Sequence, residues 1–325
     1  MQHLLASLAI AAPVALGIAA TPPGPPSHEV FSFHDPAITE ASALVVVDGL
    51  FLTVNDSGHP GDVFVVDGSG RTVGVTHWSD HPTDTEALAP GGPGHVWVGD
   101  IGDNTASRSA VEIARVPVGR GDRDVQPTTY RLTYPDGATD AETLMRDPTT
   151  GRLYIASKDV FGGVLYAVPE HLDASRPTQM KALGRVLPVA TDGSFFPDGK
   201  HLIVRSYSDA VVYAWPSLQP VGSFTLPSQR QGEGIGVTSD GKVYLSSEGP
   251  RSPVLEVELP PKIEAAVSGR VSVGPSSPAT RSPGPSDSSP SSEPEAGSRD
   301  TWPWLAGGLL GVVALVVLLR ALRPH

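Results

Sequence analysis

Acidic residues recur at the beginning of short apolar strands along this sequence. The stretch QGEGIGVTSDGKVYLSSEG, residues 231–249, places Glu233 before one such strand, and Glu40, Glu86 and Glu142 hold the same place in three others. In one further stretch Thr191 and Asp192 stand there instead. Carboxylates that gather closely repel one another, so such a set must be protonated, hydrated or neutralised by a cation. These residue types therefore indicate a cation site.

Calcium is the ion that this set of ligands suits best. Ca²⁺ accepts roughly six to eight oxygen ligands in a loose geometry, whereas Mg²⁺ requires a tighter octahedron. The chain has no cysteine and no clustered histidine near these positions, which argues against zinc. A second interpretation stays open, in which each glutamate accepts hydrogen bonds from backbone N–H groups of neighbouring strands and no metal binds.

The elements that must position these side chains form a repeat. Glu40, Glu86, Glu142, Thr191 and Glu233 are each followed by a short strand, a glycine eight or nine residues later, and a stronger strand. The apolar runs are rich in Val, Tyr, Phe and Trp and are separated by Gly, Pro, Asp and Asn, a pattern typical of strands and turns. Two further strands follow each pair except the last, which is one strand short.

This repeat predicts an all-β, five-bladed β-propeller over residues 27–267. The missing strand of the fifth unit is supplied by residues 29–33 at the N-terminus, which would pair with residues 254–259 and close the ring. The alternative is a six-bladed propeller with a degenerate blade around residues 118–135, where only two strands can be counted. Helical periodicity is absent outside the two ends of the chain.

In a propeller the first strand of each blade lines the central channel, so the beginnings of these strands converge on one face. The second strands end on the same face, with Asn55, Asp56, Asp100, Asp103, Asn104, Lys158, Asp159, Ser206, Asp209, Ser247 and Glu248. The segment before Glu86 adds His77, Asp80, His81 and Asp84, and Lys158, Arg205, Arg230 and Arg251 are expected near the rim. A cation together with these bases could hold a phosphate or a carboxylate.

The motifs EASALVVVDGLFLTVND, TEALAP, AETL, ATDGSFFPDG and GEGIGV resemble the channel motifs of calcium-activated nucleotidases, the apyrase family. Parts of the pattern also resemble phytase-like propellers. The resemblance implies a five-bladed propeller with one Ca²⁺ held by Ser42, Glu86, Glu142, Thr191 or Asp192, and Glu233. Turn spacing alone favours Glu40 in the first blade. The resemblance covers only the channel strands, and by itself it does not establish an activity.

The two ends of the chain indicate an exported, membrane-anchored protein. Residues 1–20 are apolar, end in small residues and are typical of a secretory signal peptide cut near Ala20, although an uncleaved anchor is an alternative. Residues 268–301 are rich in Pro and Ser and predict a disordered stalk. Residues 302–319 are uncharged and long enough to span a membrane, and Arg320 and Arg323 follow in a cytoplasmic tail, 320–325. We expect a single-pass type I protein with its propeller outside the cell.

Composition narrows the classes of partner. The formal net charge is -12 and basic runs are absent, which argues against nucleic acid. No nucleophile elbow, phosphate-binding loop or zinc-protease helix motif is present. We expect a monomer that binds an extracellular ligand or protein around a channel cation, and the alternative is a Ca²⁺-dependent phosphoester or phosphoanhydride hydrolase.

Overall fold

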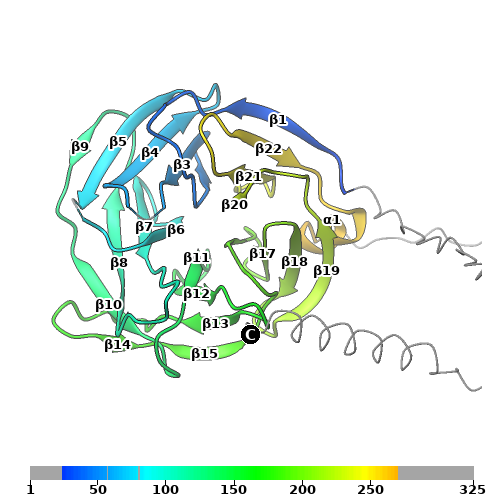
Figure 1. Ribbon diagram of the computed structural model, residues 1–325. Coiled ribbons are helices and arrows are strands. Elements are labelled where there is room, and N and C mark those ends of the chain that lie inside the picture. Colours follow the sequence, from blue (N-terminus) through cyan, green and yellow to red (C-terminus); the bar gives the residue numbers. More distant parts are fainter. Residues whose placement is uncertain (1–23, 57, 80, 270–325) are drawn as a thin grey trace, which may run out of the picture. The chain divides into compact units, whose positions relative to one another are not determined.

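The alternation of short apolar strands with glycine and aspartate turns folds into five sheets around one axis (Figure 1). The sheets are antiparallel, except that two of them carry a short parallel strand at the outer edge. The computed structural model describes residues 24–56, 58–79 and 81–269. The chain divides into two units, Met1–Val273 and Gly274–His325, and all of the described residues belong to the first. The signal peptide, nearly all of the stalk, the membrane-spanning segment and the cytoplasmic tail predicted from the sequence lie outside the described residues.

Each sheet is one blade, and its strands run in chain order from the axis outward, except that the N-terminal strand forms the outer edge of blade 5. Blade 1 contains β2 (Val45–Val47), β3 (Leu50–Val54), β4 (Gly61–Asp67), β5 (Thr72–Ser79) and β9 (Arg123–Asp124). Blade 2 contains β6 (Thr85–Pro90), β7 (His95–Asp100), β8 (Val111–Pro117), β10 (Thr129–Thr133) and β14 (Thr178–Gln179). Blade 3 contains β11 (Ala141–Arg146), β12 (Leu153–Ser157), β13 (Val164–Ala167) and β15 (Lys181–Arg185).

Blade 4 contains β16 (Asp192–Phe195), β17 (His201–Arg205), β18 (Asp209–Ala214) and β19 (Gln219–Thr225). Blade 5 contains β20 (Gly232–Val237), β21 (Val243–Ser247), β22 (Pro253–Val257) and, as its outer strand, β1 (Ser27–Ser32). The five-bladed propeller is thus confirmed. The six-bladed alternative fails because residues 118–135 supply β9 to the edge of blade 1 and β10 to blade 2.

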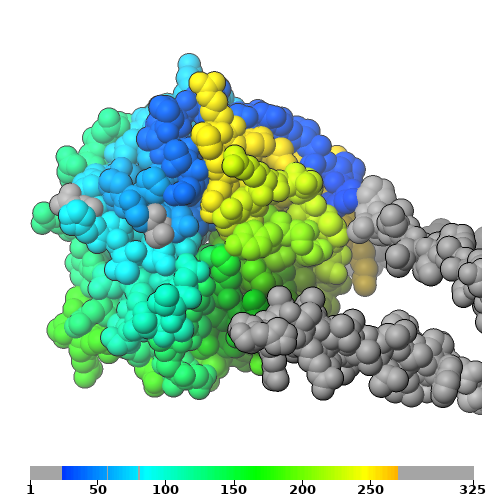
Figure 2. All heavy atoms as spheres, viewed as in Figure 1, coloured from blue at the N-terminus to red at the C-terminus, as the bar shows by residue number. Residues whose placement is uncertain are grey.

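The ring closes as the sequence predicts. β1 pairs antiparallel with β22, from Ser27 opposite Val257 to Ser32 opposite Pro253. In the space-filling view the blue N-terminal residues accordingly lie against the yellow residues of blade 5 (Figure 2). The inner strands also contact one another in a closed cycle, β2, β6, β11, β16, β20 and back to β2.

Five apolar cores hold the blades together, one at each interface between neighbouring blades. Alternate residues of each strand point to opposite faces of its sheet, so every blade contributes to the core on either side. The five predicted turn glycines, Gly49, Gly94, Gly151, Gly199 and Gly241, all have positive φ, between 61° and 86°. That conformation is unfavourable for a residue with a Cβ, which explains the regular spacing of glycine.

One element differs from the prediction. Residues 261–267 form a short helix, α1 (Pro261–Val267), where the sequence shows no helical periodicity. Its one buried residue, Ile263, packs into the core between blades 4 and 5. Val267 packs against the same core, and two apolar residues are too few to produce a clear periodic pattern. Among the described residues no helix is long and apolar enough to cross a membrane.

Candidate metal centre

The two ends of the central channel differ in chemistry. Where the inner strands end, all five blades line an apolar pocket of about 240 Å³, with Leu44, Val46, Leu88, Leu144, Phe195 and Val237 among its walls. Where the inner strands begin, the buried side chains are acidic or hydroxylated: Ser42, Asp84, Glu86, Glu142, Thr191, Asp192 and Glu233. We call this polar end the channel mouth. It is the face on which the sequence predicts the cation site.

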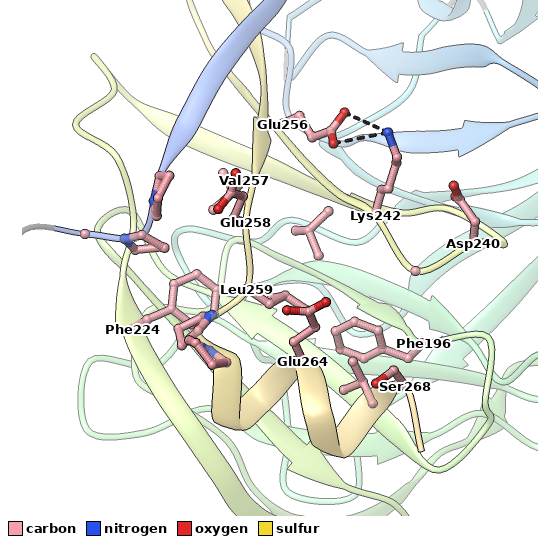
Figure 3. Close-up of a pocket in the computed structure, with 18 of the residues that line it drawn as sticks. Phe196, Phe224, Asp240, Lys242, Glu256, Val257, Glu258, Leu259, Glu264 and Ser268 are labelled. Carbon is pink, nitrogen blue, oxygen red and sulfur yellow. Dashed lines mark hydrogen bonds and ion pairs between the residues drawn. The ribbon is translucent and has the colours of Figure 1, made fainter. Parts of the chain in front are cut away.

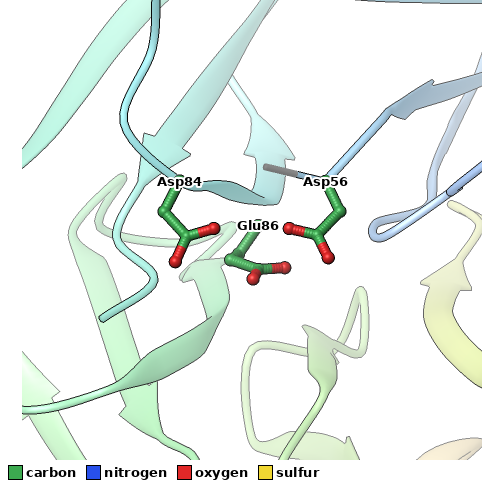
Figure 4. Close-up of side chains that lie close together, drawn as sticks. All are labelled: Asp56, Asp84 and Glu86. Atoms are coloured by element: carbon green, nitrogen blue, oxygen red, sulfur yellow. The ribbon is translucent and has the colours of Figure 1, made fainter. Parts of the chain in front are cut away.

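Three carboxylates in the channel mouth converge from blades 1 and 2. Asp56 follows the end of β3, Asp84 immediately precedes β6, and Glu86 lies within β6. One oxygen of each lies within 4.8 Å of an oxygen of the other two. The Asp84 and Asp56 carboxylates point toward each other on either side of Glu86 (Figure 4). These three residues are called the Asp-Asp-Glu cluster below.

The backbone around Asp84 is held in place from blade 2. The Asp100 carboxylate, at the end of β7, accepts the N–H groups of Thr83 at 2.8 Å and Asp84 at 2.9 Å. Gly102 lies so close that a Cβ there would sit 2.4 Å from Asp84 Oδ2. Only glycine permits this approach. Asp84 is therefore positioned by the end of β7 and by the close approach of Gly102.

The environment of the Asp-Asp-Glu cluster favours neutralisation of its charge. Glu86 is 3% exposed, and burial, together with the nearby Glu142 and Asp56 carboxylates, raises its pKa well above the usual range. Burial and the charge of Asp56 raise the pKa of Asp84 to about 6. Arg108, which opposes that rise, is already paired with Asp100 at 2.8 Å. Burial and mutual repulsion therefore favour either protons or a cation on the cluster.

Glu142 and Glu233 form the other half of the channel mouth, together with a lysine. Lys158, at the end of β12, makes an ion pair and a hydrogen bond with Glu142 Oε1. Burial and the Glu233 carboxylate raise the pKa of Glu142, against the influence of Lys158. Burial raises the pKa of Glu233 to about 7. Lys158 was expected near the rim, but the structure places its ammonium on a predicted metal ligand.

Thr191 and Asp192 are buried and bonded to the backbone. The Thr191 hydroxyl donates to the Glu233 carbonyl oxygen at 3.1 Å. Asp192 accepts the N–H groups of Ile235 at 2.8 Å, Gly193 at 2.7 Å and Leu44 at 3.3 Å, and so joins blade 4 to blades 5 and 1. Burial raises the pKa of Asp192, and these amides oppose the rise. For Asp192, the structure thus agrees with the second interpretation, in which an acid accepts backbone N–H groups of neighbouring strands.

The expectation that Arg205 reaches the rim is wrong. Its side chain is 0% exposed, and its guanidinium donates to the carbonyl oxygens of Gly234, Ser206 and Tyr207 between the channel strands of blades 4 and 5. Burial lowers its pKa to about 10, against the Glu233 and Asp192 carboxylates. Arg205 is the last residue of β17. The sequence does not show that its side chain points into the interior rather than toward the rim.

In blade 1 the structure brings Ser42, rather than Glu40, to the buried cluster. The Ser42 hydroxyl is 1% exposed and lies 2.7 Å from Glu86 Oε2. The Glu40 side chain is 45% exposed and accepts a hydrogen bond from His59 at 2.7 Å. Turn spacing in the sequence favoured Glu40. In the structure, however, β2 begins only at Val45, and residue 41 forms just an isolated bridge with Asn55, so the spacing does not identify the residue that faces the channel.

The residues present fit a hard divalent cation. Asp84 Oδ1, Glu142 Oε2 and Glu233 Oε2 are buried oxygens without a hydrogen-bond partner among the described residues. A buried acceptor left unsatisfied costs about 1–3 kcal/mol, more if charged. Carboxylate oxygens are the ligands that Ca²⁺ prefers. Asp56 and Asp84 stood among the polar residues expected on this face, but sequence spacing gave no sign that they would join Glu86.

A second pocket lies away from the channel mouth. It has a volume of about 1290 Å³ and lies between blades 4 and 5 against α1, and its walls carry Asp240, Glu256, Glu258 and Glu264 (Figure 3). Lys242 pairs with Glu256 at 3.2 Å inside it. None of the seven predicted ligands lines this pocket.

Comparisons with known proteins leave the family open. No family model and no curated protein matches the chain, so the resemblance to apyrases and phytases finds no support there. Among solved structures, a crystal structure of glucose dehydrogenase matches with a TM-score of 0.43 and 13% identity, over 73% of this chain and 100% of that chain. A second glucose dehydrogenase structure matches with the same values. Similarity at this level carries no inference about activity.

Proposed function

We propose that this protein is a cell-surface β-propeller that binds an extracellular ligand or protein partner through a Ca²⁺ ion in its channel mouth. The observation that carries the proposal is the Asp-Asp-Glu cluster, in which three carboxylate oxygens lie within 4.8 Å of one another. Asp84 and Glu86 are both buried, and Asp84 Oδ1 has no hydrogen-bond partner among the described residues. The apolar run at 302–319 supports display at a membrane.

The cluster would leave room for a partner on the ion. With one oxygen from each carboxylate, the chain supplies three ligands, whereas Ca²⁺ accepts roughly six to eight. Water, or oxygen atoms of a bound molecule, would fill the remaining positions. Asp56 is the most exposed member of the cluster, so the ion would face the solvent side of the channel mouth. Binding of the partner would then require calcium.

Calorimetric titration of the full-length protein with Ca²⁺ tests the metal. We expect saturable binding that is lost or weakened at least about tenfold, which is about 1.4 kcal/mol, in Glu86→Gln and Asp84→Asn. Glu258→Gln is the matched control, because Glu258 is exposed in the pocket between blades 4 and 5. Absence of calcium binding by the wild-type protein would contradict the proposal.

The same proteins decide between binding and catalysis. Phosphate release from ATP, ADP or phytate would be measured with and without calcium. Phosphate release that needs calcium and disappears in Glu86→Gln would show that the protein is a calcium-dependent phosphohydrolase rather than a binding module. No release, together with calcium binding, is the result that a binding module predicts.

A further inference from the structure

One half of the channel mouth contains a cation supplied by the protein itself, the ammonium group of Lys158. Its ammonium group is bonded to Glu142 Oε1, and its Nζ lies 5.2 Å from the centre of the Tyr207 ring. The Lys158 side chain is only 17% exposed, so the ion pair is largely withdrawn from water. Tyr207 covers it from blade 4.

The acids beside Lys158 have more oxygens than the lysine can satisfy. Glu142 is 4% exposed and Glu233 is 3% exposed. Glu142 Oε2 and Glu233 Oε2 have no hydrogen-bond partner among the described residues. The Gln231 amide makes a long contact, 3.3 Å, with Glu233 Oε1. Buried charges are normally paired or bound to metal, so this half of the mouth is built around a cation.

The channel mouth therefore contains two acidic groups with different sources of neutralisation. The Asp-Asp-Glu cluster has no lysine or arginine ion pair to Asp84 or Glu86 in the part of the chain that is described. Beside Glu142 and Glu233, by contrast, the Lys158 ammonium supplies a positive charge. A lysine is a compact point charge on a flexible stem, which suits it to stand where a small ion could bind.

We propose that the Lys158 ammonium takes the place of a second metal ion, and that Glu142 and Glu233 form a latent divalent-cation site that Lys158 keeps closed. The inference rests on the proposed function, because it assigns the calcium of the wild-type protein to the Asp-Asp-Glu cluster alone. Lys158 thereby sets the number of ions in the channel mouth to one.

Removal of the ammonium should open the second site. Lys158→Met keeps an unbranched apolar stem but leaves Glu142 and Glu233 without their cation. Loss of one partner from a buried ion pair is strongly unfavourable, because the remaining charge is uncompensated. A divalent ion with oxygen ligands from both glutamates would relieve that cost. Lys158→Arg keeps the charge and should keep the site closed.

The test is the stoichiometry of Ca²⁺ binding to the full-length protein, measured by calorimetry. We expect one ion in the wild type and in Lys158→Arg, two in Lys158→Met, and a return to one in Lys158→Met combined with Glu142→Gln. Lys242→Met, which breaks the Lys242–Glu256 pair far from the channel mouth, is the control and should bind one ion.

The outcomes separate this inference from the proposed function. One ion in both the wild type and Lys158→Met would overturn the latent site and leave the Asp-Asp-Glu site standing. No ion in the wild type but one in Lys158→Met, lost on Glu142→Gln, would support the latent site and contradict the proposed function. No binding in either protein would overturn both. Circular dichroism and the Lys158→Arg variant show whether a loss of binding reflects misfolding.

Discussion

The Ser42 hydroxyl of blade 1 lies within hydrogen-bonding distance of two oxygens of Glu86 in blade 2. The Ser42 hydroxyl lies 2.7 Å from Glu86 Oε2 and 3.0 Å from the Glu86 carbonyl oxygen. Both residues are almost completely buried, so neither oxygen can turn to water instead. This contact fixes the acid at the centre of the proposed calcium site and joins the first two blades at the axis.

Replacement of Ser42 by alanine should therefore affect both stability and calcium binding. The Glu86 oxygens would lose their buried donor, which costs about 1–3 kcal/mol in free energy of unfolding. We expect the calcium affinity to change as well, because Glu86 is no longer held. Urea unfolding of Ser42→Ala would show this, with Ser175→Ala as the exposed control. Equal stability of both variants would show that the contact contributes nothing.

Asp192 should act as a structural lock rather than as a calcium ligand. Its carboxylate accepts three backbone N–H groups, from Leu44, Gly193 and Ile235. Asp192→Asn turns an amide NH₂ toward at least one of these donors. We expect a loss of about 2 kcal/mol in stability with calcium stoichiometry unchanged. A variant that is as stable as the wild type but has lost calcium binding would place Asp192 among the ligands instead.

Closure of the ring depends on the N-terminal strand. Phe31 in β1 packs edge-on against Phe51 of blade 1, with ring centroids 4.8 Å apart, and Phe51 packs in turn against Tyr244 of blade 5. Phe31→Ala should lower the free energy of unfolding by about 3–5 kcal/mol, the usual cost of a buried phenylalanine.

The same substitution at Phe161 is the matched control, because its ring is 90% exposed. Phe161→Ala should leave stability within about 0.5 kcal/mol of the wild type. Deletion of residues 27–32 should also expose the edge of β22 and promote aggregation. If Phe31→Ala and Phe161→Ala have the same melting temperature, β1 does not close the propeller in solution.

The blades could be predicted from the sequence because each repeats the same local signals. Apolar runs, turn glycines and the missing fifth-blade strand each specify backbone structure within a few residues, and pairing of β1 with β22 follows from the need to close the ring. The side chains in the channel mouth depend on finer detail. A difference of two residues in blade 1 decides between Glu40 and Ser42, and β2 starts too late for the turn spacing to settle it.

Contacts between side chains of different strands were the part that the sequence could not provide. Asp56 and Asp84 meet only because β3 and β6 are neighbours around the axis, and Lys158 meets Glu142 across a strand pair whose register slips between Ala141 and Thr143. Arg205 looked like a rim residue because charged side chains are rarely buried without a charged partner in contact. Its backbone partners, which make burial possible, lie on another blade and in the adjoining loop.

Stability without metal should fall as the pH rises from about 4 to about 7. Burial raises the pKa of Glu233 from 4.5 to about 7 and that of Asp84 from 3.8 to about 6. The folded state therefore binds more protons than the unfolded chain in this range. The stabilisation is fully present below the unfolded pKa values and is lost as the pH passes the folded ones.

For Glu233 this linkage corresponds to about 3 kcal/mol at most. Thermal melts of metal-free protein at pH 5 and pH 7.5 would measure it, and Glu233→Gln should flatten the dependence. Calcium should restore stability most strongly at pH 7.5, where it has fewer protons to displace than at pH 5. A metal-free protein that gains stability over this pH range would contradict the raised pKa values.

The position of the ion is the most direct test of the metal centre. Crystals of the protein grown with Ca²⁺, or with Tb³⁺ in its place, would show the ion by anomalous scattering. We predict a peak in the channel mouth with oxygens of Asp56, Asp84 and Glu86 at about 2.3–2.6 Å. A channel mouth without a peak at saturating calcium, or a peak bound by none of these three carboxylates, would contradict the assignment.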